Sequence, residues 1–356
     1  MLSLQTEVCH LFEIEFPIIQ AGMAGGPATA ELAAAVSNAG GLGTLGAAYL
    51  EPEALREAIA EVKAASRKPF AVNIFTSNDK GDLSRLEEVQ RALAPLRKEL
   101  AIEKPVITSS ADWSRQQFEI CLEMGVPVIS TAFGLLDDEQ LQAAKSARIK
   151  TIAMATTVEE AKMAERSGVD AVVAQGSEAG GHRGTFSLEH HPNGAQIGTM
   201  SLVPQIVDAV KIPVIAAGGI ADGRGLVAAL ALGAGAVQIG TRFLLAEEAG
   251  THPAYQQKIV DSTEEQTTVT TSFSGRPARA IKNRFIKEFE DAGTKALPFP
   301  SHNTVTRDIR NAAAKRNDSE FMSLWAGQTL RLMNKKMAAA QMIREIMADA
   351  KRILGE

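Results

Sequence analysis

One histidine stands in a glycine-rich stretch of the chain, Ala174 to Gly184, with the sequence AQGSEAGGHRG. Gly180 and Gly181 directly precede His182. Glycines allow a backbone to pass close to a bound group, and an imidazole titrates near neutral pH, where it can accept a proton from a carbon acid or hydrogen-bond an anion. We therefore predict that His182 is a catalytic residue. Arg183 beside it either attracts an anionic substrate or lies solvated in the loop.

A second group of glycines has the arrangement of a phosphate site. The stretch AAGGIADGRGLVAALALGAGAVQIGTRF, residues 216–243, joins a strand, two glycines, a helix, a strand and a Gly-Thr pair. Gly218 and Gly219 follow the first of these strands, and Gly240 and Thr241 follow the second. Backbone N–H groups at such strand ends, together with a helix N-terminus, often bind phosphate in barrels of alternating strands and helices. The absence of a G-x-x-x-x-G-K-[ST] sequence argues against a nucleotide triphosphatase.

Amide side chains lie near the carboxyl ends of other apolar strands, at Gln20, Asn73 and Gln175. Any one of them could simply satisfy a neighbouring backbone group. Together they suit a flat heterocycle that has both donors and acceptors. These amides and the phosphate glycines favour a cofactor with one phosphate and one polar ring system.

The elements that must position these residues alternate between short apolar strands and longer helical patterns. Strands are predicted at 17–23, 41–46, 70–75, 127–133, 150–156, 170–176, 213–219 and 236–241. Helices lie between them, for example at 52–65 and 157–168, the latter ending on a glycine. Eight such units predict a closed α/β TIM (β/α)8 barrel, with an open doubly wound sheet as the competitor. A ninth candidate, 105–110, is assigned to an extended loop.

Two further sequence features bear on the fold. GLGTLG, residues 41–46, matches G-x-G-x-x-G, but a helical pattern precedes it, so we interpret its glycines as close packing of a barrel strand. From residue 249 the alternation stops. We expect a barrel at 1–248 and a C-terminal lid and helical segment at 249–356, whose Met-rich last helix packs on the barrel or on a partner in a homodimer.

Composition excludes several classes of protein. The formal net charge of −5 offers no basic excess for nucleic acid. Cys9 and Cys121 stand far apart, which disfavours a disulfide framework and fits the cytoplasm. No secretory leader or membrane span is expected. His190 and His191 lack a third ligand, so we expect no metal.

These stretches resemble a known family. AQGSEAGGHRG, PIIQAGMAGG near the start and the AAGGIADGRG…AVQIGTRF region are similar to the FMN-dependent nitronate monooxygenases, formerly called 2-nitropropane dioxygenases. The resemblance runs from about Pro17 to Gly327, and SGRPARAIKN (274–283) and WAGQ (325–328) look like further family elements.

The resemblance implies that FMN binds on the barrel and that His182 is the active-site histidine. The implied cofactor contacts are Ala21, Gly22, Met23, Asn73, Gln175, Gly180, Gly181, Gly218, Gly219, Gln238, Gly240 and Thr241. The implied reaction oxidises a small alkyl nitronate, such as propionate 3-nitronate, with O2 to a carbonyl product and nitrite. Two alternatives remain: an FMN-dependent enoyl-acyl carrier protein reductase that uses NADH, and a barrel that binds flavin or another phosphorylated ligand without catalysis.

Overall fold

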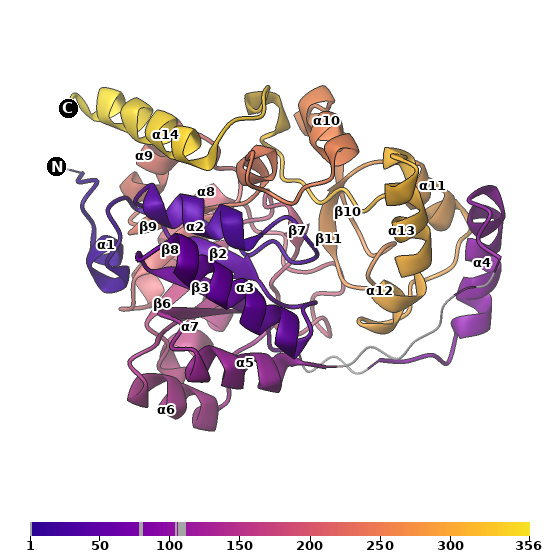
Figure 1. Cartoon of the computed structure of the whole chain (residues 1–356), viewed down its shortest axis with the longest axis horizontal. Helices are drawn as coiled ribbons and strands as arrows, with labels where there is room; N and C mark the ends of the chain where they lie inside the picture. Colours follow the sequence, from indigo (N-terminus) through magenta and orange to yellow (C-terminus); the bar gives the residue numbers. More distant parts are fainter. Residues whose placement is uncertain (1, 78–80, 104, 106–111) are drawn as a thin grey trace.

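The computed structural model describes residues 2–77, 81–103, 105 and 112–356. Eight parallel strands form one sheet, in the order β1-β9-β8-β6-β5-β4-β3-β2, with helices around it (Figure 1). Its two outer strands also meet. Ile19 bridges Leu42 in parallel, and the N–H groups of Gln20 and Leu42 donate to the carbonyls of Leu42 and Ile18, each at 2.9 Å. This closure confirms the TIM barrel and excludes the open doubly wound sheet.

All eight strands lie within their predicted ranges. They are β1 (Ile18–Gln20), β2 (Gly43–Gly46), β3 (Phe70–Phe75), β4 (Val128–Ala132), β5 (Lys150–Ala155), β6 (Ala171–Gln175), β8 (Val214–Ala217) and β9 (Ala236–Ile239). Of the ninth candidate, residues 106–110 lie outside the described residues. Because all eight strands run the same way, their carboxyl ends meet at one mouth of the barrel.

The α-helices of residues 1–248 follow the sequence signals closely. They are α1 (Glu7–Phe12), α2 (Ala30–Asn38), α3 (Pro52–Ala65), α4 (Leu86–Glu99), α5 (Ser114–Glu123), α6 (Asp138–Ser146), α7 (Val158–Ser167), α8 (Thr199–Ala209) and α9 (Gly223–Ala231). In α7, the Thr157 hydroxyl accepts from the N–H of Glu160, and Gly168 ends the helix at φ 89°. Both caps satisfy backbone groups that a helix end leaves unpaired.

Apolar side chains fill the barrel interior, and α1 closes its amino-terminal end. Ile19, Ile152 and Ile215 belong to one interior cluster with Val8 and Phe12 of α1. The helix sits so close that a Cβ on Gly235, just before β9, would lie 2.7 Å from a Val8 methyl carbon. With this end plugged, the carboxyl ends of the strands form the accessible mouth, where TIM barrels place their sites.

The glycines of GLGTLG do pack closely, as predicted. A Cβ on Gly43 would lie 1.9 Å from the Ala33 carbonyl oxygen of α2, and one on Gly46 would lie 2.6 Å from the Ala24 nitrogen. No side chain fits at either position. A Cβ at Gly43 would overlap α2, and a Cβ at Gly46 would overlap the loop after β1. This confirms that the glycines of this strand allow close packing.

The chain after the barrel adds a small sheet and further helices. These elements are η1 (Thr241–Leu245), α10 (Pro253–Asp261), η2 (Glu264–Gln266), β10 (Thr267–Thr270), β11 (Ala278–Ile281), α11 (Arg284–Asp291), α12 (Ser301–Val305), α13 (Arg307–Lys315), η3 (Ser319–Phe321), η4 (Leu330–Leu332) and α14 (Ala339–Leu354). β10, β11 and the short β7 (Gly181–His182) form an antiparallel sheet. This sheet joins the histidine loop to the C-terminal segment.

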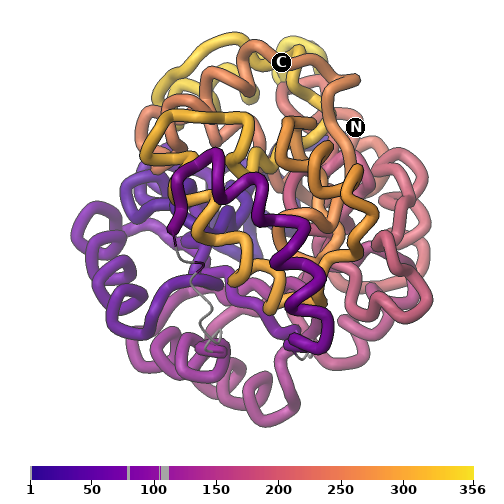
Figure 2. Tube along the Cα trace, turned by 90° about the vertical axis from the view of Figure 1, so that its right-hand side faces the viewer, coloured from indigo at the N-terminus to yellow at the C-terminus, as the bar shows by residue number. Residues whose placement is uncertain are grey.

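Helix α4, from the long segment after β3, lies against the C-terminal helices (Figure 2). Arg97 of α4 makes an ion pair of 2.7 Å with Asp308 of α13, and both side chains are buried. Its guanidinium also donates to the Val305 carbonyl at 2.8 Å. A buried pair that satisfies its hydrogen bonds fixes the relative placement of two segments far apart in sequence.

The last helix packs on the chain's own barrel. Met342, Ile346 and Met347 of α14 are buried, and the helix lies along α9 and α2. Its apolar face is therefore already covered without a partner. Within the described residues, no helix has the length and apolar character to cross a membrane.

Candidate functional site

The residues predicted to bind phosphate, which follow β8 and β9, lie side by side because these two strands are neighbours in the barrel. Gly218 and Gly219 follow β8 at φ 107° and 72°, a backbone conformation that favours glycine. No described protein atom accepts a hydrogen bond from the backbone N–H of Gly219 or Thr241. We call Gly218, Gly219, Gly240 and Thr241 the cradle.

The N-terminus of α9 is already capped by a side chain of the chain itself. The Asp222 carboxylate caps α9 by accepting from the N–H groups of Arg224 and Gly225, at 3.0 and 3.4 Å. Its charge already offsets the positive end of this helix dipole. The donors that remain in the cradle come from the loop after β8 and from Thr241, the first residue of η1.

The other predicted contacts line the same mouth. Ala21, Gly22 and Met23 follow β1. A Cβ on Gly22 would lie 2.4 Å from the Cβ of Asn73, and one on Gly240 would lie 3.6 Å from Ala21. The Asn73 amide donates to the Ser130 hydroxyl at 2.9 Å, and Gln238 is half-buried on β9. The β1 loop thus stands between Asn73 and the cradle. Gln20, in contrast, serves the barrel wall, where its side-chain oxygen accepts from the Thr44 N–H.

Gln175 holds the histidine loop in place. Its amide nitrogen donates to the His182 carbonyl at 3.0 Å, and its amide oxygen accepts from the Gly184 N–H at 2.8 Å. A Cβ on Gly180 would lie 2.5 Å from the Gly327 nitrogen, so this glycine is needed for contact with the WAGQ stretch. Gly181 instead needs its φ of 74°, because nothing lies within 4 Å of its Cβ position. The two adjacent glycines have different physical roles.

Four aromatic rings surround the imidazole of His182. They are Phe75, Phe133, Phe299 and Trp325, with ring centroids 5.2–6.4 Å from that of His182. Phe133, directly after β4, has φ 75°. This backbone conformation is uncommon and strained for a residue other than glycine. We call these four rings the cage.

The imidazole is held by Ser274, in the loop before β11. His182 Nε2 lies 2.8 Å from the Ser274 hydroxyl, which also lies 3.1 Å from the Arg276 carbonyl. When the hydroxyl donates to that carbonyl, it accepts from Nε2–H, and Nδ1 is then the ring nitrogen that can accept a proton.

Burial and nearby cations lower the pKa of His182. Desolvation is the largest cause, followed by the charges of Arg276 and Arg310, and the pKa falls to about 3. The Arg276 guanidinium carbon lies 4.1 Å from the centre of the Phe133 ring. The sequence suggested a histidine that titrates near neutral pH. The structure corrects this, because His182 is neutral there.

Arg183 has neither of the roles considered from the sequence. Its side chain is fully buried, and its guanidinium donates to the carbonyls of Gln175, Gly176 and Ala195 at 2.8, 2.8 and 3.3 Å. It therefore braces the end of β6 and faces neither substrate nor solvent. Lys282 and Arg284 lie away from the cage: Lys282 bonds to the Glu265 carbonyl and Arg284 pairs with Glu99.

Comparison with known proteins shows the family to which the chain belongs. The family model described as nitronate monooxygenase matches residues 5–349. The chain belongs to the nitronate monooxygenase family. It is 43% identical over 358 residues to a probable nitronate monooxygenase of Staphylococcus saprophyticus, covering 99% of both chains. It is 42% identical over 333 residues to one from Staphylococcus aureus, covering 92% of each.

Solved structures agree with this assignment. A nitroalkane oxidase from Streptomyces ansochromogenes has a TM-score of 0.91 at 36% identity, with 98% of this chain and 99% of that one covered. FabK from Thermotoga maritima has a TM-score of 0.78 at 34% identity, with 99% and 98% covered. Nitronate monooxygenases are flavin-dependent oxidoreductases, so this chain is an enzyme of that kind, and a non-catalytic barrel is excluded.

Several residues of this family member's site were missed from the sequence. Ser274, Arg276 and Trp325 lie within the two stretches recognised as family elements, but no role was given to them. Phe133 and Phe299 carried no sequence signal. Aromatic residues at strand ends are common in cores, so only their convergence on His182 distinguishes these.

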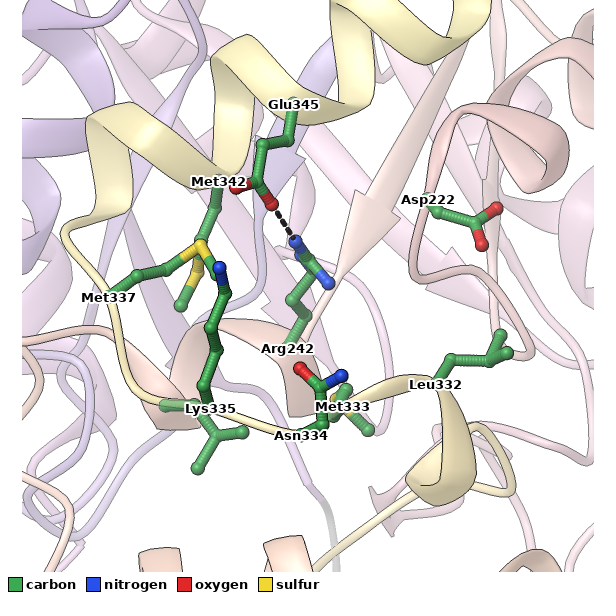
Figure 3. A pocket seen from close by; sticks show the side chains of 10 residues that line it. Asp222, Arg242, Leu332, Met333, Asn334, Lys335, Met337, Met342 and Glu345 are labelled. Carbon is green, nitrogen blue, oxygen red and sulfur yellow. Dashed lines mark hydrogen bonds and ion pairs between the residues drawn. The ribbon is translucent and has the colours of Figure 1, made fainter.

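A separate cavity of about 310 Å³ lies between η1, η4 and α14, away from the cage (Figure 3). Arg242 points across it to Glu345 of α14, at 2.9 Å. Because Arg242 follows Thr241 directly, this ion pair anchors the cradle loop to the last helix. None of the residues predicted for the site lines the cavity.

Proposed function

We propose that this enzyme oxidises small alkyl nitronates, such as propionate 3-nitronate, with O2 to a carbonyl product and nitrite, and that its cofactor is FMN. Membership of the nitronate monooxygenase family supports the reaction. The observation that carries the choice of substrate is His182, a neutral imidazole inside an aromatic cage at the barrel mouth. We place the reaction in the cytoplasm, which fits two cysteines that are both free.

The cradle fits the phosphate of FMN. Backbone donors at Gly219 and Thr241 lack described protein acceptors, and the atoms nearest to the Cβ position of Gly240 lie 3.6 and 4.0 Å away, in Ala21 and Met23. The ring would then extend towards Ala21–Met23, Asn73, Gln175, Gly180, Gly181 and Gln238. Bound FMN supplies one-electron chemistry with organic substrates and O2.

The state of His182 favours a nitronate over a neutral nitroalkane. A nitroalkane must lose a carbon proton, and an imidazole whose pKa has fallen to about 3 is a weak base for that step. A nitronate has already lost this proton. His182 then orients the anion beside the flavin, while Arg276 supplies positive charge and the four rings exclude water.

Parallel assays test this proposal. Purified protein loaded with FMN is given propionate 3-nitronate in air, and oxygen uptake and nitrite are measured. A second sample receives NADH and an enoyl thioester. We expect nitrite release with oxygen uptake in the first assay and little NADH oxidation in the second. Rapid NADH oxidation dependent on the enoyl thioester, with no nitrite from the nitronate, would establish the reductase instead.

A further inference from the structure

The cavity of about 310 Å³ between η1, η4 and α14 is lined by apolar and charged side chains (Figure 3). Its volume falls in the range of small-molecule sites, about 300–1,000 Å³. The buried apolar side chains of its wall are Leu245, Met333, Met337 and Met342. Methionine side chains are flexible and adapt to apolar groups of irregular shape. The wall therefore suits the aliphatic part of a small molecule.

The charged side chains of the cavity leave one positive charge in excess. Glu345 pairs with Arg242, and Asp222 pairs with Arg224 outside the lining. Lys335 also lines the cavity and makes no ion pair with a described residue. The Arg242 side chain donates to Glu345 alone among the described residues, and its buried Nε has no acceptor. The cavity therefore favours a single negative charge, because a second one would lie near the two carboxylates.

This cavity is built on the loop that carries the cradle. Arg242 follows Thr241 directly, and Lys335 lies on the connector between η4 and α14, residues 333–338. The connector is already bonded to the end of η1 and the chain after it. The Met337 N–H donates to the Leu245 carbonyl at 3.2 Å, and the Met337 carbonyl accepts from the next chain segment at 3.1 Å. A ligand bound by both Arg242 and Lys335 adds a further link between the connector and the cradle loop.

We propose that this cavity binds a small aliphatic monocarboxylate and that its binding strengthens the FMN site. The carboxylate accepts from the Lys335 ammonium and from the Arg242 N–H groups that Glu345 leaves unused, while the aliphatic chain packs on the methionine wall. Because the bound anion ties Arg242 to the connector, it holds the backbone donor of Thr241 in place, and a pre-ordered donor binds phosphate more tightly. The coupling rests on the proposed FMN site, whereas binding of the carboxylate does not.

Isothermal titration calorimetry of the flavin-loaded enzyme with hexanoate tests the ligand class. Hexanoate should bind at least about tenfold more tightly than acetate, because its longer chain buries apolar surface on the wall. Hexylamine, which has the same chain and a positive charge, should not bind detectably. Equal binding of acetate and hexanoate, or binding of hexylamine as tight as that of hexanoate, would overturn the proposed ligand class.

Two substitutions with opposite expected effects locate the site. Lys335→Met removes the unpaired cation and should weaken hexanoate binding about five- to tenfold. Lys336→Met is the matched control, since Lys336 is also exposed but does not line the cavity. Glu345→Gln keeps an amide oxygen for Arg242 and removes the negative charge, so hexanoate should bind more tightly, a gain that misfolding cannot produce. Equal affinity in wild type, Lys335→Met and Glu345→Gln would overturn the site.

Retention of FMN measures the coupling. The loaded enzyme is diluted with and without hexanoate, and the released FMN is measured by its fluorescence. Hexanoate should lower the FMN dissociation constant at least about fivefold in wild type and leave it unchanged in Lys335→Met. FMN release that hexanoate does not alter would overturn the coupling. If the protein holds no FMN, the cofactor proposal fails, and titration of the same variants with hexanoate still decides whether the carboxylate site exists.

Discussion

The cradle and the cage occupy the same mouth of the barrel but are built in opposite ways. The cradle uses backbone groups from residues 218–241, two adjacent loops of one stretch of chain. The cage uses side chains from β3, the end of β4 and the C-terminal segment, and Ser274 holds its histidine. A site made of backbone groups is local, and it can be predicted from the order of strands, glycines and helices along the chain. A side-chain site depends on tertiary packing.

The two regions also differ in charge. Around the cradle, acidic groups balance basic ones: Asp222 caps α9 and Glu345 pairs with Arg242. Around the cage, Arg276 and Arg310 add to burial in lowering the pKa of His182. We therefore expect the cage, rather than the cradle, to select the substrate.

The largest effect should come from the centre of the cage. His182→Asn removes the ring that orients the anion, and we expect kcat/KM for nitronates to fall by about 10²–10³. Flavin absorbance should remain unchanged, because the cradle is untouched. Steady-state kinetics and spectra of the same preparation measure both. Full activity on nitronate and nitroalkane alike would remove His182 from the mechanism.

The next largest effect should come from Arg183, which holds the end of β6 in place. Arg183→Met leaves three backbone carbonyls without their buried donor, and we expect about 3 kcal/mol of destabilisation with KM for nitronate preserved. Arg316→Met is the control, since Arg316 also donates to backbone carbonyls but is exposed, so its loss should cost far less. Denaturant unfolding compares them. A higher KM in a stable Arg183→Met protein would restore the substrate-binding role.

A smaller effect is expected from a substitution at Gly180, where the histidine loop contacts the WAGQ stretch. Gly180→Ala places a Cβ 2.5 Å from a backbone nitrogen, and we expect about 1–3 kcal/mol of destabilisation together with weaker flavin retention. Gly198→Ala is the matched control, because the nearest atom to its Cβ position lies 3.4 Å away, in the Glu178 side chain. Flavin content after gel filtration is the measurement. Equal retention by both variants would contradict the contact with the WAGQ stretch.

The smallest effect should be a pH dependence of the C-terminal segment. Burial lowers the pKa of His302 from 6.5 to about 4. The unfolded chain then binds more protons, so stability should be fully present above about pH 6.5 and decline as pH falls towards 4. His302 also accepts from the Leu297 N–H and lies 2.8 Å from the Ser272 carbonyl. Thermal unfolding of His302→Asn should show a lower midpoint at pH 7 but a shallower acid decline; an identical slope would assign the decline elsewhere.

The barrel was predictable because its determinants are short-range. β-branched runs marked each strand, and caps such as Thr157 and Gly168 marked the helix ends. The cradle followed from the same local order. Arg183 was misjudged because an arginine beside a histidine has the same sequence whether it faces substrate or three carbonyls.

The eight-strand barrel, the cradle glycines and the glycine-rich loop of His182 could be predicted before folding was considered, since each depends on residues that are neighbours along the chain. The tertiary structure was needed to bring Ser274, Phe299 and Trp325 together around His182. It also decided that His182 is neutral, because a pKa depends on burial and on charges brought together from distant segments. That environment exists only once α13 and β11 have packed on the barrel.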